Sequence, residues 1–365
     1  MTALPRIANV PYTNKEELTC PRCGSHNVRR RGHRKKKLEI VQLWRCAACK
    51  RTFTPGPEAL RNKTYPLRII LGALTDYDLG YSLEQTAARL KKKSNQAVSP
   101  STISAWLETY KAHTTYRRLR PVARTRFTPE QTIRSIKLYH RQIYGFAYHR
   151  PKLEMLRSGA LDDKRAGGLG STARFGNVAD FLESVPTTCP HELFTHEDDP
   201  KARASQAHPT FADVSRIIVN RKENAATETA ALIIPAVGNN KLRHETLQRF
   251  MLANDSVTIA IEIPIWLDED DIAALERKHG IELAAKAGAP RVITGHLDFL
   301  QVRNGAVHIL DYKPDARTNK PIAQLAIYAL TRRVPGLKLF DIKCAWFNEA
   351  EYCEFFPRTL FTRSR

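Results

Sequence analysis

The sequence lacks long apolar runs. No stretch reaches the roughly 18 apolar residues that a membrane span requires, and the first residues, MTALPRIANV, lack the apolar core of a secretory signal. We therefore expect no membrane partner and a reducing, cytoplasmic setting. The phosphate-loop pattern G-x-x-x-x-G-K-[S/T] is also absent, which argues against a built-in ATPase.

Acidic residues are scarce relative to basic ones. The 365 residues contain 58 Lys and Arg against 37 Asp and Glu, a formal net charge of +21. Residues 1–125 hold 25 Lys and Arg against 8 Asp and Glu, so this part carries +17, and the rest, with 33 against 29, carries +4. Such an imbalance predicts a nucleic-acid partner, because phosphate backbones attract clustered cations. A merely solvated basic face is the alternative.

Cysteine is rare, yet four of the seven cysteines form two C-x-x-C pairs, Cys20 with Cys23 and Cys46 with Cys49. Two such pairs separated by a basic, strand-forming stretch predict a zinc ribbon with a tetrahedral four-cysteine site. Disulfides are the alternative, and a reducing compartment disfavours them. DNA contacts are expected from the basic residues between the pairs, which are Arg29, Arg30, Arg31, Arg34, Lys35, Lys36 and Lys37.

Three helices are predicted next, beginning near Pro66, Ser82 and Ser99. Ser82 with Gln85 forms a capping box, and Ser99 before Pro100 is an N-cap with proline in the first turn. The second and third helices are typical of a helix-turn-helix, whose last helix would present Ser101, Thr102 and Ser104 to DNA and bury Ile103, Trp106 and Leu107. Phosphate contacts are expected from Arg117, Arg118 and Arg120. A small helical bundle without a DNA role is the alternative.

The ribbon and these helices, over about residues 18–110, resemble the N-terminal DNA-binding part of insertion-sequence transposases. The resemblance implies DNA as the partner and a mobile element, or defence against one, as the setting. No integrase-like acidic triad follows, because no clear strand context would bring together Asp162, Asp163, Asp180 and Glu183.

Two β-rich runs near the C-terminus, residues 292–302 and 306–312, are joined by Asn304 and Gly305, which favour a tight hairpin turn. Paired strands would bring Asp298 near Asp311, and Lys313 would project from the same face as Asp311. Two carboxylates suit Mg²⁺ or Mn²⁺, and a lysine beside them suits charge that develops on a phosphate. Solvated side chains at a strand end are the alternative, because D-x-K alone is common by accident.

The neighbouring segments strengthen the prediction of a site. Gln324 and Tyr328 are four apart in a predicted helix and so share one face. His244 lies in the periodic run 241–252, and Glu262 interrupts the apolar strand 257–266, where an unpartnered carboxylate would cost several kcal/mol.

These residues and their order resemble the PD-(D/E)XK nuclease superfamily, most closely its RecB-type branch, over about residues 241–356. The resemblance implies metal ligation by His244, Glu262, Asp298 and Asp311, a catalytic Lys313, and DNA or metal-shell contacts from Gln324 and Tyr328. A surface or capping role is the alternative for His244, with Glu245 as a substitute ligand. Many relatives carry four cysteines for an iron–sulfur cluster, and only Cys189, Cys344 and Cys353 are available here, so we predict no cluster.

The expectation is a multidomain protein. It comprises a zinc ribbon in residues 1–60, a helix-turn-helix domain in 61–125, a linker or bridging region of unclear fold in 126–240, and a mixed α/β restriction-endonuclease-like core in 241–365. The predicted function is a Mg²⁺- or Mn²⁺-dependent deoxyribonuclease, nucleoid-associated, with a transposase or helicase as candidate partner. A sequence-specific DNA-binding regulator with an inactive nuclease fold, or an RNA-processing nuclease, are the alternatives.

Overall fold

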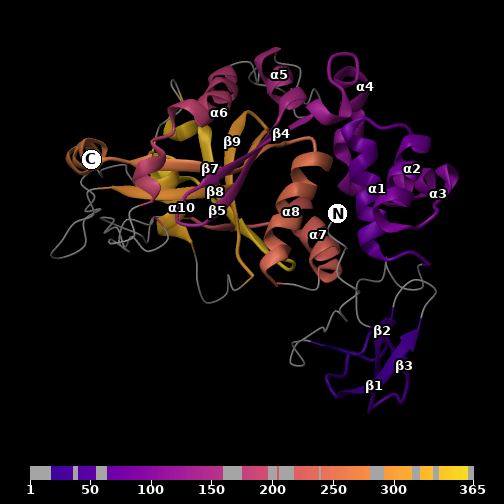
Figure 1. Ribbon diagram of the computed structural model, residues 1–365. Coiled ribbons are helices and arrows are strands. Elements are labelled where there is room, and N and C mark those ends of the chain that lie inside the picture. Colours follow the sequence, from indigo (N-terminus) through magenta and orange to yellow (C-terminus); the bar gives the residue numbers. More distant parts are fainter. Residues whose placement is uncertain are drawn as a thin grey trace.

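The computed structural model contains two sheets and the helices that cover the larger of them (Figure 1). It describes residues 18–35, 40–54, 64–158, 175–195, 204, 218–237, 240–279, 292–314, 321–331 and 337–360. The fold is mixed α/β, as expected.

The smaller sheet has the strand order β1 (Val28–Lys35), β2 (Ile40–Cys46) and β3 (Thr52–Phe53), all antiparallel. Leu18, Val28 and Trp44 are buried with two of the cysteines in a hydrophobic cluster of its own. Figure 1 shows this sheet set apart from the rest of the chain. Because its apolar core is so small, the cysteines must contribute much of its stability.

The larger sheet has eight strands in the order β4-β5-β7-β8-β9-β10-β11-β6. Neighbours are antiparallel except β9 and β10, which run parallel. The strands are β4 (Ile133–Tyr139), β5 (Ile143–His149), β6 (Asn220–Arg221), β7 (Thr258–Leu267), β8 (Ile293–Arg303), β9 (Ala306–Tyr312), β10 (Ile342–Phe347) and β11 (Tyr352–Phe355).

The region expected to be a linker belongs to this sheet. Residues 126–240 supply β4 and β5 at one edge and β6 at the other, together with helices α5 (Arg150–Ser158), α6 (Gly176–Thr188) and α7 (Ala225–Ile233). The sequence analysis left the fold of this linker or bridging region unclear, and its described part supplies strands and helices of the large sheet. Strand pairing across more than a hundred residues leaves no trace in local composition, which is why the sequence did not indicate it.

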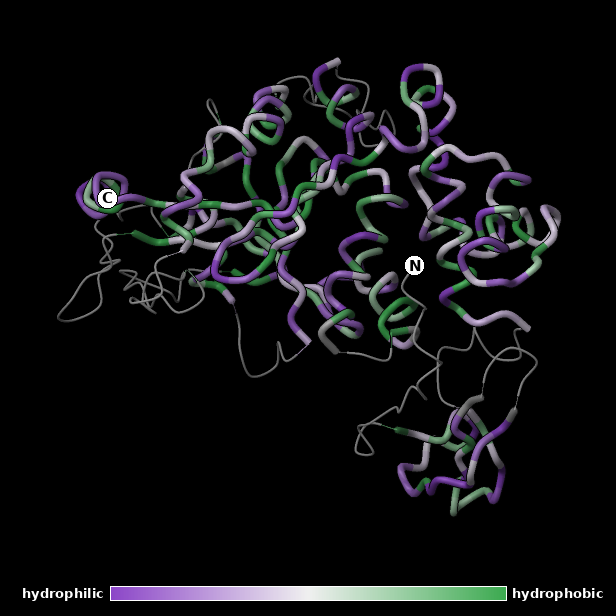
Figure 2. The backbone as a smooth tube through the Cα atoms, in the orientation of Figure 1, coloured by the Kyte–Doolittle hydropathy of each residue, from purple (hydrophilic) through white to green (hydrophobic). Residues whose placement is uncertain are grey.

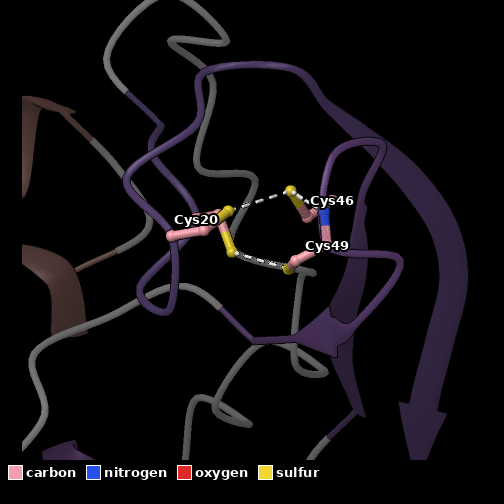
Figure 3. Close-up of side chains that lie close together, drawn as sticks. Cys20, Cys46 and Cys49 are labelled. Atoms are coloured by element: carbon pink, nitrogen blue, oxygen red, sulfur yellow. Dashed lines mark hydrogen bonds between the residues drawn. The ribbon is translucent and has the colours of Figure 1, made fainter.

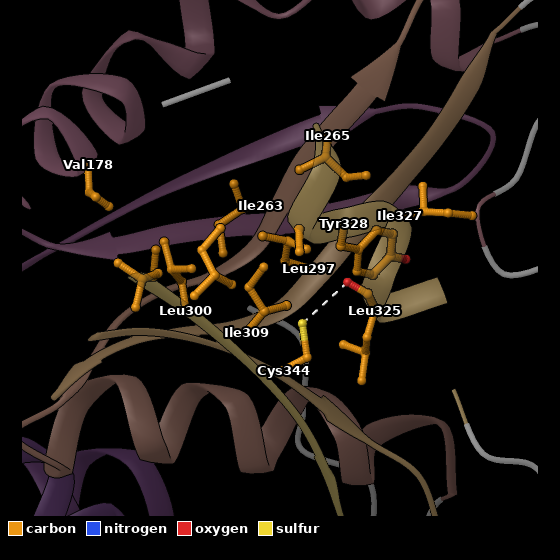
Figure 4. Packing of buried hydrophobic residues seen from close by; sticks show 14 of the residues in the cluster. Val178, Ile263, Ile265, Leu297, Leu300, Ile309, Leu325, Ile327, Tyr328 and Cys344 are labelled. Carbon is orange, nitrogen blue, oxygen red and sulfur yellow. Dashed lines mark hydrogen bonds between the residues drawn. The ribbon is translucent and has the colours of Figure 1, made fainter. Parts of the chain in front are cut away.

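Successive side chains of the central strands enter two different apolar layers, as the period of two requires. Ile309 packs in the layer with α6 and α10 (Ile322–Leu330), whereas Leu310 packs with α7 and α8 (Asn240–Asn254). Figure 4 shows part of the first layer, with Leu297, Ile309 and Leu325 together and the Cys344 thiol donating to the Leu325 carbonyl over 3.4 Å. Figure 2 shows hydrophobic residues along the strands of the large sheet and along the helices around it. Helix α9 (Glu269–His279) follows β7 and contacts it.

The three N-terminal helices form as predicted: α1 (Leu67–Leu79), α2 (Leu83–Ser94) and α3 (Pro100–Thr109). The Ser82 capping box and the Ser99 N-cap are both present. These helices share one hydrophobic cluster with α7, α8 and one face of the large sheet, and α1 lies against α8 (Figure 1). They are therefore packed into the sheet's own core, with no break in packing at residue 125. No helix in the described ranges has the length and apolar character to cross a bilayer.

Candidate metal and nucleic-acid sites

The predicted hairpin positions the acidic residues. Asn304 and Gly305 adopt φ of 51° and 64°, the left-handed values of a tight hairpin turn. β8 pairs with β9 from Arg303 opposite Ala306 to Phe299 opposite Leu310 and then stops, whereas β9 continues beside β10. In the gap, the Tyr312 backbone N–H donates to Asp298 Oδ2 over 3.0 Å. The strands thus diverge where the two acids face each other.

Asp298 and Asp311 are both buried, with exposed fractions of 9% and 3%. Burial alone would raise the pKa of Asp298, but the adjacent His244 lowers that pKa to about 2. Burial and then the Asp298 carboxylate raise the pKa of Asp311 well above its usual range. Asp298 therefore favours its ionised form, and Asp311 resists ionisation unless a nearby cation offsets the charge of the pair.

Lys313 lies beside this pair, with Nζ 3.1 Å from Asp311 Oδ2. Burial would lower the pKa of Lys313, but the interactions with Asp311 and Asp298 together outweigh burial and raise it. The lysine is therefore a fixed positive charge. Its backbone N–H donates to the Phe347 carbonyl, which anchors the end of β9 to β10.

Helix α8 and strand β7 complete a cluster. His244 Nε2 lies 2.8 Å from Asp298 Oδ2, and His244, Glu262 and Asp298 each offer a ligand atom within 4.8 Å of the others. Burial would lower the pKa of His244, yet Asp298 raises it to about 9. The alternative ligand Glu245 instead pairs with Arg249 at 3.0 Å and is exposed.

Glu262 has an unusual backbone. It adopts φ of 51° in the middle of β7, a left-handed value that costs a non-glycine residue about 1–3 kcal/mol. Its neighbours pair as Ile261 with Phe299 and Ile263 with Leu297, so Glu262 lies opposite Asp298. Burial raises the pKa of Glu262 to about 7, with Asp298 contributing next. Such strain beside an opposed carboxylate is typical of a functional position.

Gln248 is a residue of this cluster that the sequence analysis missed. Its side chain is 2% exposed and donates to Glu262 Oε1 over 2.7 Å, and it also lies 3.2 Å from His244 Nε2. Gln248 is one helical turn after His244, so the i, i+4 spacing that identified Gln324 and Tyr328 would have indicated it.

Gln324 and Tyr328 of α10 meet as predicted, with the amide donating to the Tyr328 hydroxyl over 2.6 Å. Burial and then Asp311 raise the pKa of Tyr328 well above its usual range. The Tyr328 ring lies against Gly295 of β8. A Cβ at position 295 would be 2.8 Å from the ring carbon Cε1, closer than side chains tolerate. Glycine at 295 therefore admits the tyrosine to the neighbourhood of the acids.

The four N-terminal cysteines converge (Figure 3). Cys20 Sγ is 3.6 Å from Cys49 Sγ, and Cys23 Sγ is 3.6 Å from Cys46 Sγ, and all four sulfurs lie within 4.8 Å of one another. The Cys49 backbone N–H lies 3.5 Å from Cys46 Sγ and lowers the pKa of that thiol to about 6. A set of four thiolates at this spacing could hold a metal such as zinc.

The basic residues between the cysteine pairs lie on the small sheet. Arg29, Arg30, Arg31 and Arg34 are exposed on β1, and the Arg30 guanidinium lies 5.7 Å from the Trp44 ring centroid. Lys36 and Lys37 fall outside the described residues, and so does the Lys35 side chain.

The residues of α3 that were expected to face DNA differ in their exposure to solvent. Ser101 and Ser104 are exposed, whereas Thr102 is half-buried and its backbone N–H is capped by Ser99. Arg120 does not face solvent, which corrects the expected phosphate contact. It is buried, and its guanidinium donates to the carbonyls of Tyr77, Gly80 and Tyr81 at the end of α1.

The other two arginines beyond α3 have protein partners. Arg117 pairs with Glu108 at 2.6 Å, and Arg118 donates to Ser256.

Comparison of the chain with protein-family models, with curated proteins and with solved structures finds no match.

Proposed function

We propose that this protein is a metal-dependent nuclease that cuts DNA and is guided to it by its cysteine-held basic ribbon and by helix α3. The observation that carries the proposal is the convergence of three acids, a histidine and a lysine from one helix and three strands, with Asp298 and Asp311 buried and Glu262 half-buried. The left-handed φ of Glu262 adds weight, because folding alone gives no reason to bear that strain.

The donor set fits a hard divalent cation. Glu262 faces Asp298 across the β7–β8 ladder, and Asp311 interacts with Asp298 from β9. Opposed buried carboxylates repel each other unless a cation lies between them. Carboxylate oxygens with one imidazole suit Mg²⁺ or Mn²⁺. His244, Glu262, Asp298 and Asp311 would hold this ion, which when bound would polarise the phosphate and acidify a water.

The other residues of the site supply positive charge or hold neighbouring side chains in position. Lys313 remains protonated, so it stabilises negative charge on the phosphate oxygens and does not accept a proton. Gln248 holds the Glu262 carboxylate with its amide. Tyr328, anchored by Gln324 and seated on Gly295, offers a hydroxyl beside Asp311. Each of these groups is fixed before substrate arrives, which is what an electrostatic contribution to catalysis requires.

The direct test is cleavage of supercoiled plasmid, linear duplex and single-stranded DNA with Mg²⁺, Mn²⁺ or EDTA. We expect metal-dependent cutting that Asp311→Asn removes, because the amide preserves shape but cannot supply the charge. Asp341→Asn, at another buried acid remote from the cluster in sequence, is the matched control. Tight DNA binding without cutting under any condition would favour a DNA-binding regulator or a nuclease that needs a transposase or helicase partner. Preferential cutting of RNA would favour an RNA-processing enzyme.

A further inference from the structure

A second group of metal-binding side chains lies outside the carboxylate site. His140 follows β4, Cys189 ends α6, and His191 begins the short turn after it. One ligand atom of each lies within 4.8 Å of the others, and His140 Nε2 is 3.0 Å from His191 Nδ1. The proposed nuclease chemistry uses none of these three residues.

The backbone brings the three donors together. The Cys189 backbone N–H caps α6 by donating to the Val185 carbonyl, and the chain then turns so that the His191 N–H donates to the Cys189 carbonyl over 2.9 Å. The Arg141 N–H donates to the Phe194 carbonyl, which ties the β4–β5 turn to the same segment. These bonds hold a cysteine and a histidine two residues apart against a histidine from the sheet edge.

The ring of His140 is oriented from both sides. Its Nδ1 lies 2.8 Å from His296 Nε2 on β8, and Phe194 stacks on it with ring centroids 4.1 Å apart. If Nδ1 donates to His296, the lone pair of Nε2 is left facing His191 and Cys189. Histidines that ligate metals usually have such a partner on the other nitrogen, which sets the tautomer and the ring plane. His296 in turn stacks on Tyr144 at 3.4 Å.

We propose that His140, Cys189 and His191 form a second metal site that binds a zinc-class ion, with His296 as the residue that positions His140. Two imidazoles and one thiolate are borderline and soft donors, which select zinc over Mg²⁺ or Mn²⁺. A chain of hydrogen bonds among neutral imidazoles is the competing explanation. Such a chain would form without the Cys189 thiol and with a proton on His191 Nδ1, whereas the metal site needs the thiol and a free Nδ1 lone pair.

Such an ion would link three elements: the β4–β5 edge, the end of α6 and, through His296, the strand that carries Asp298. His296 and Asp298 are two apart on β8. The ion would thereby brace the strand on which the carboxylate site depends. Metal affinity and stability can be measured without cleavage, so this site can be tested independently of the nuclease activity.

The test uses the full chain with Cys46→Ser and Cys49→Ser, which disables the ribbon site, kept in excess Mg²⁺ to occupy the carboxylate site. We expect about one Co²⁺ per chain with a thiolate charge-transfer band. Cys189→Ser should remove that band, whereas the matched variant Cys344→Ser, at another buried cysteine, should retain it. His296→Ala should weaken Co²⁺ binding about 10- to 100-fold and leave the band in place at saturation.

His191→Ala keeps the test informative if Cys189→Ser does not fold, because His191 is only half-buried. Loss of Co²⁺ affinity in this variant, with the far-ultraviolet circular dichroism spectrum unchanged, would support the site. A chain with the disabled ribbon that binds no Co²⁺ through thiolate, or a band that survives Cys189→Ser, would overturn the proposal.

Discussion

The small N-terminal sheet and the large sheet each hold several polar groups in one place, but they do so in different ways. The ribbon gathers four cysteines from two short turns within thirty residues of chain, and its arginines point to solvent. The large sheet and α8 gather His244, Glu262, Asp298 and Asp311 from separate elements; the two aspartates are buried, and His244 and Glu262 are half-buried. A site built by local turns needs a metal to be stable, whereas a site built by a packed sheet can hold unfavourable charges in place before any metal binds.

The helices between these two regions follow the large sheet. α1 contributes Ile70 and Leu74 to the cluster that contains Phe299 and Phe347. The Arg120 guanidinium and the Lys152 ammonium, both buried, donate to main-chain carbonyls at this junction. Helix α3 therefore shares a hydrophobic cluster with the large sheet, whereas the ribbon has a cluster of its own.

The largest expected effect separates chemistry from binding. Lys313→Ala should lower the cleavage rate about 10²- to 10³-fold, because the lost charge acts mainly on the transition state. DNA affinity, measured by fluorescence anisotropy with Ca²⁺ in place of Mg²⁺, should change little. Lys343→Ala, at a lysine of β10 paired with Glu354, is the control. Equal losses of affinity and rate would contradict the role given to Lys313.

Disabling the ribbon should weaken DNA binding and leave the cleavage step intact. Cys46→Ser removes a thiolate from the four-cysteine site, so we expect the small sheet to unfold and its arginines to lose their common surface. The slope of log affinity against log salt should become shallower by about 0.9 for each phosphate that the ribbon no longer neutralises. Cleavage at saturating DNA should persist. Cys353→Ser, at a buried cysteine of β11, serves as control, and an unchanged salt slope in Cys46→Ser would refute the ribbon's role in binding DNA.

Gly295→Ala should show how closely the large-sheet site is packed. The added methyl would overlap the Tyr328 ring, so we expect a loss of about 1–3 kcal/mol in the free energy of unfolding and slower cleavage. In the double variant of Gly295→Ala and Tyr328→Ala, the loss of stability should be smaller than the sum of the two single losses, and the rate should stay low. Urea denaturation with single-turnover cleavage checks both, and additive effects of the two substitutions would argue against the contact.

The smallest expected effect concerns the buried Lys152, whose ammonium donates to the Leu252 and Thr258 carbonyls. Burial lowers the pKa of Lys152 to about 8 from an ordinary value of 10.5. Between these values the unfolded chain binds more protons, so stability should rise with pH. Relative to Lys152→Met, the wild-type chain should gain no more than about 2 kcal/mol between pH 8 and about 9.5. Urea midpoints across this range test it. A stability difference that falls with pH would show that the charged ammonium is favoured.

Features that depend on a few adjacent residues could be predicted from the sequence. The C-x-x-C pairs, the Asn304–Gly305 turn and the caps at Ser82 and Ser99 form where expected, because turn and cap geometry follow from local backbone preferences. The spacing of Gln324 and Tyr328 likewise predicted their contact.

Which distant segments meet became visible only in the folded chain. Neither the place of β4, β5 and β6 in the large sheet nor the burial of Arg120 could be deduced from local patterns. The same holds for the positive φ of Glu262, and for the group formed by His140, Cys189 and His191. Strand order and long-range packing are set by the total free energy of burying apolar surface over the whole chain, and no short window of sequence contains that sum.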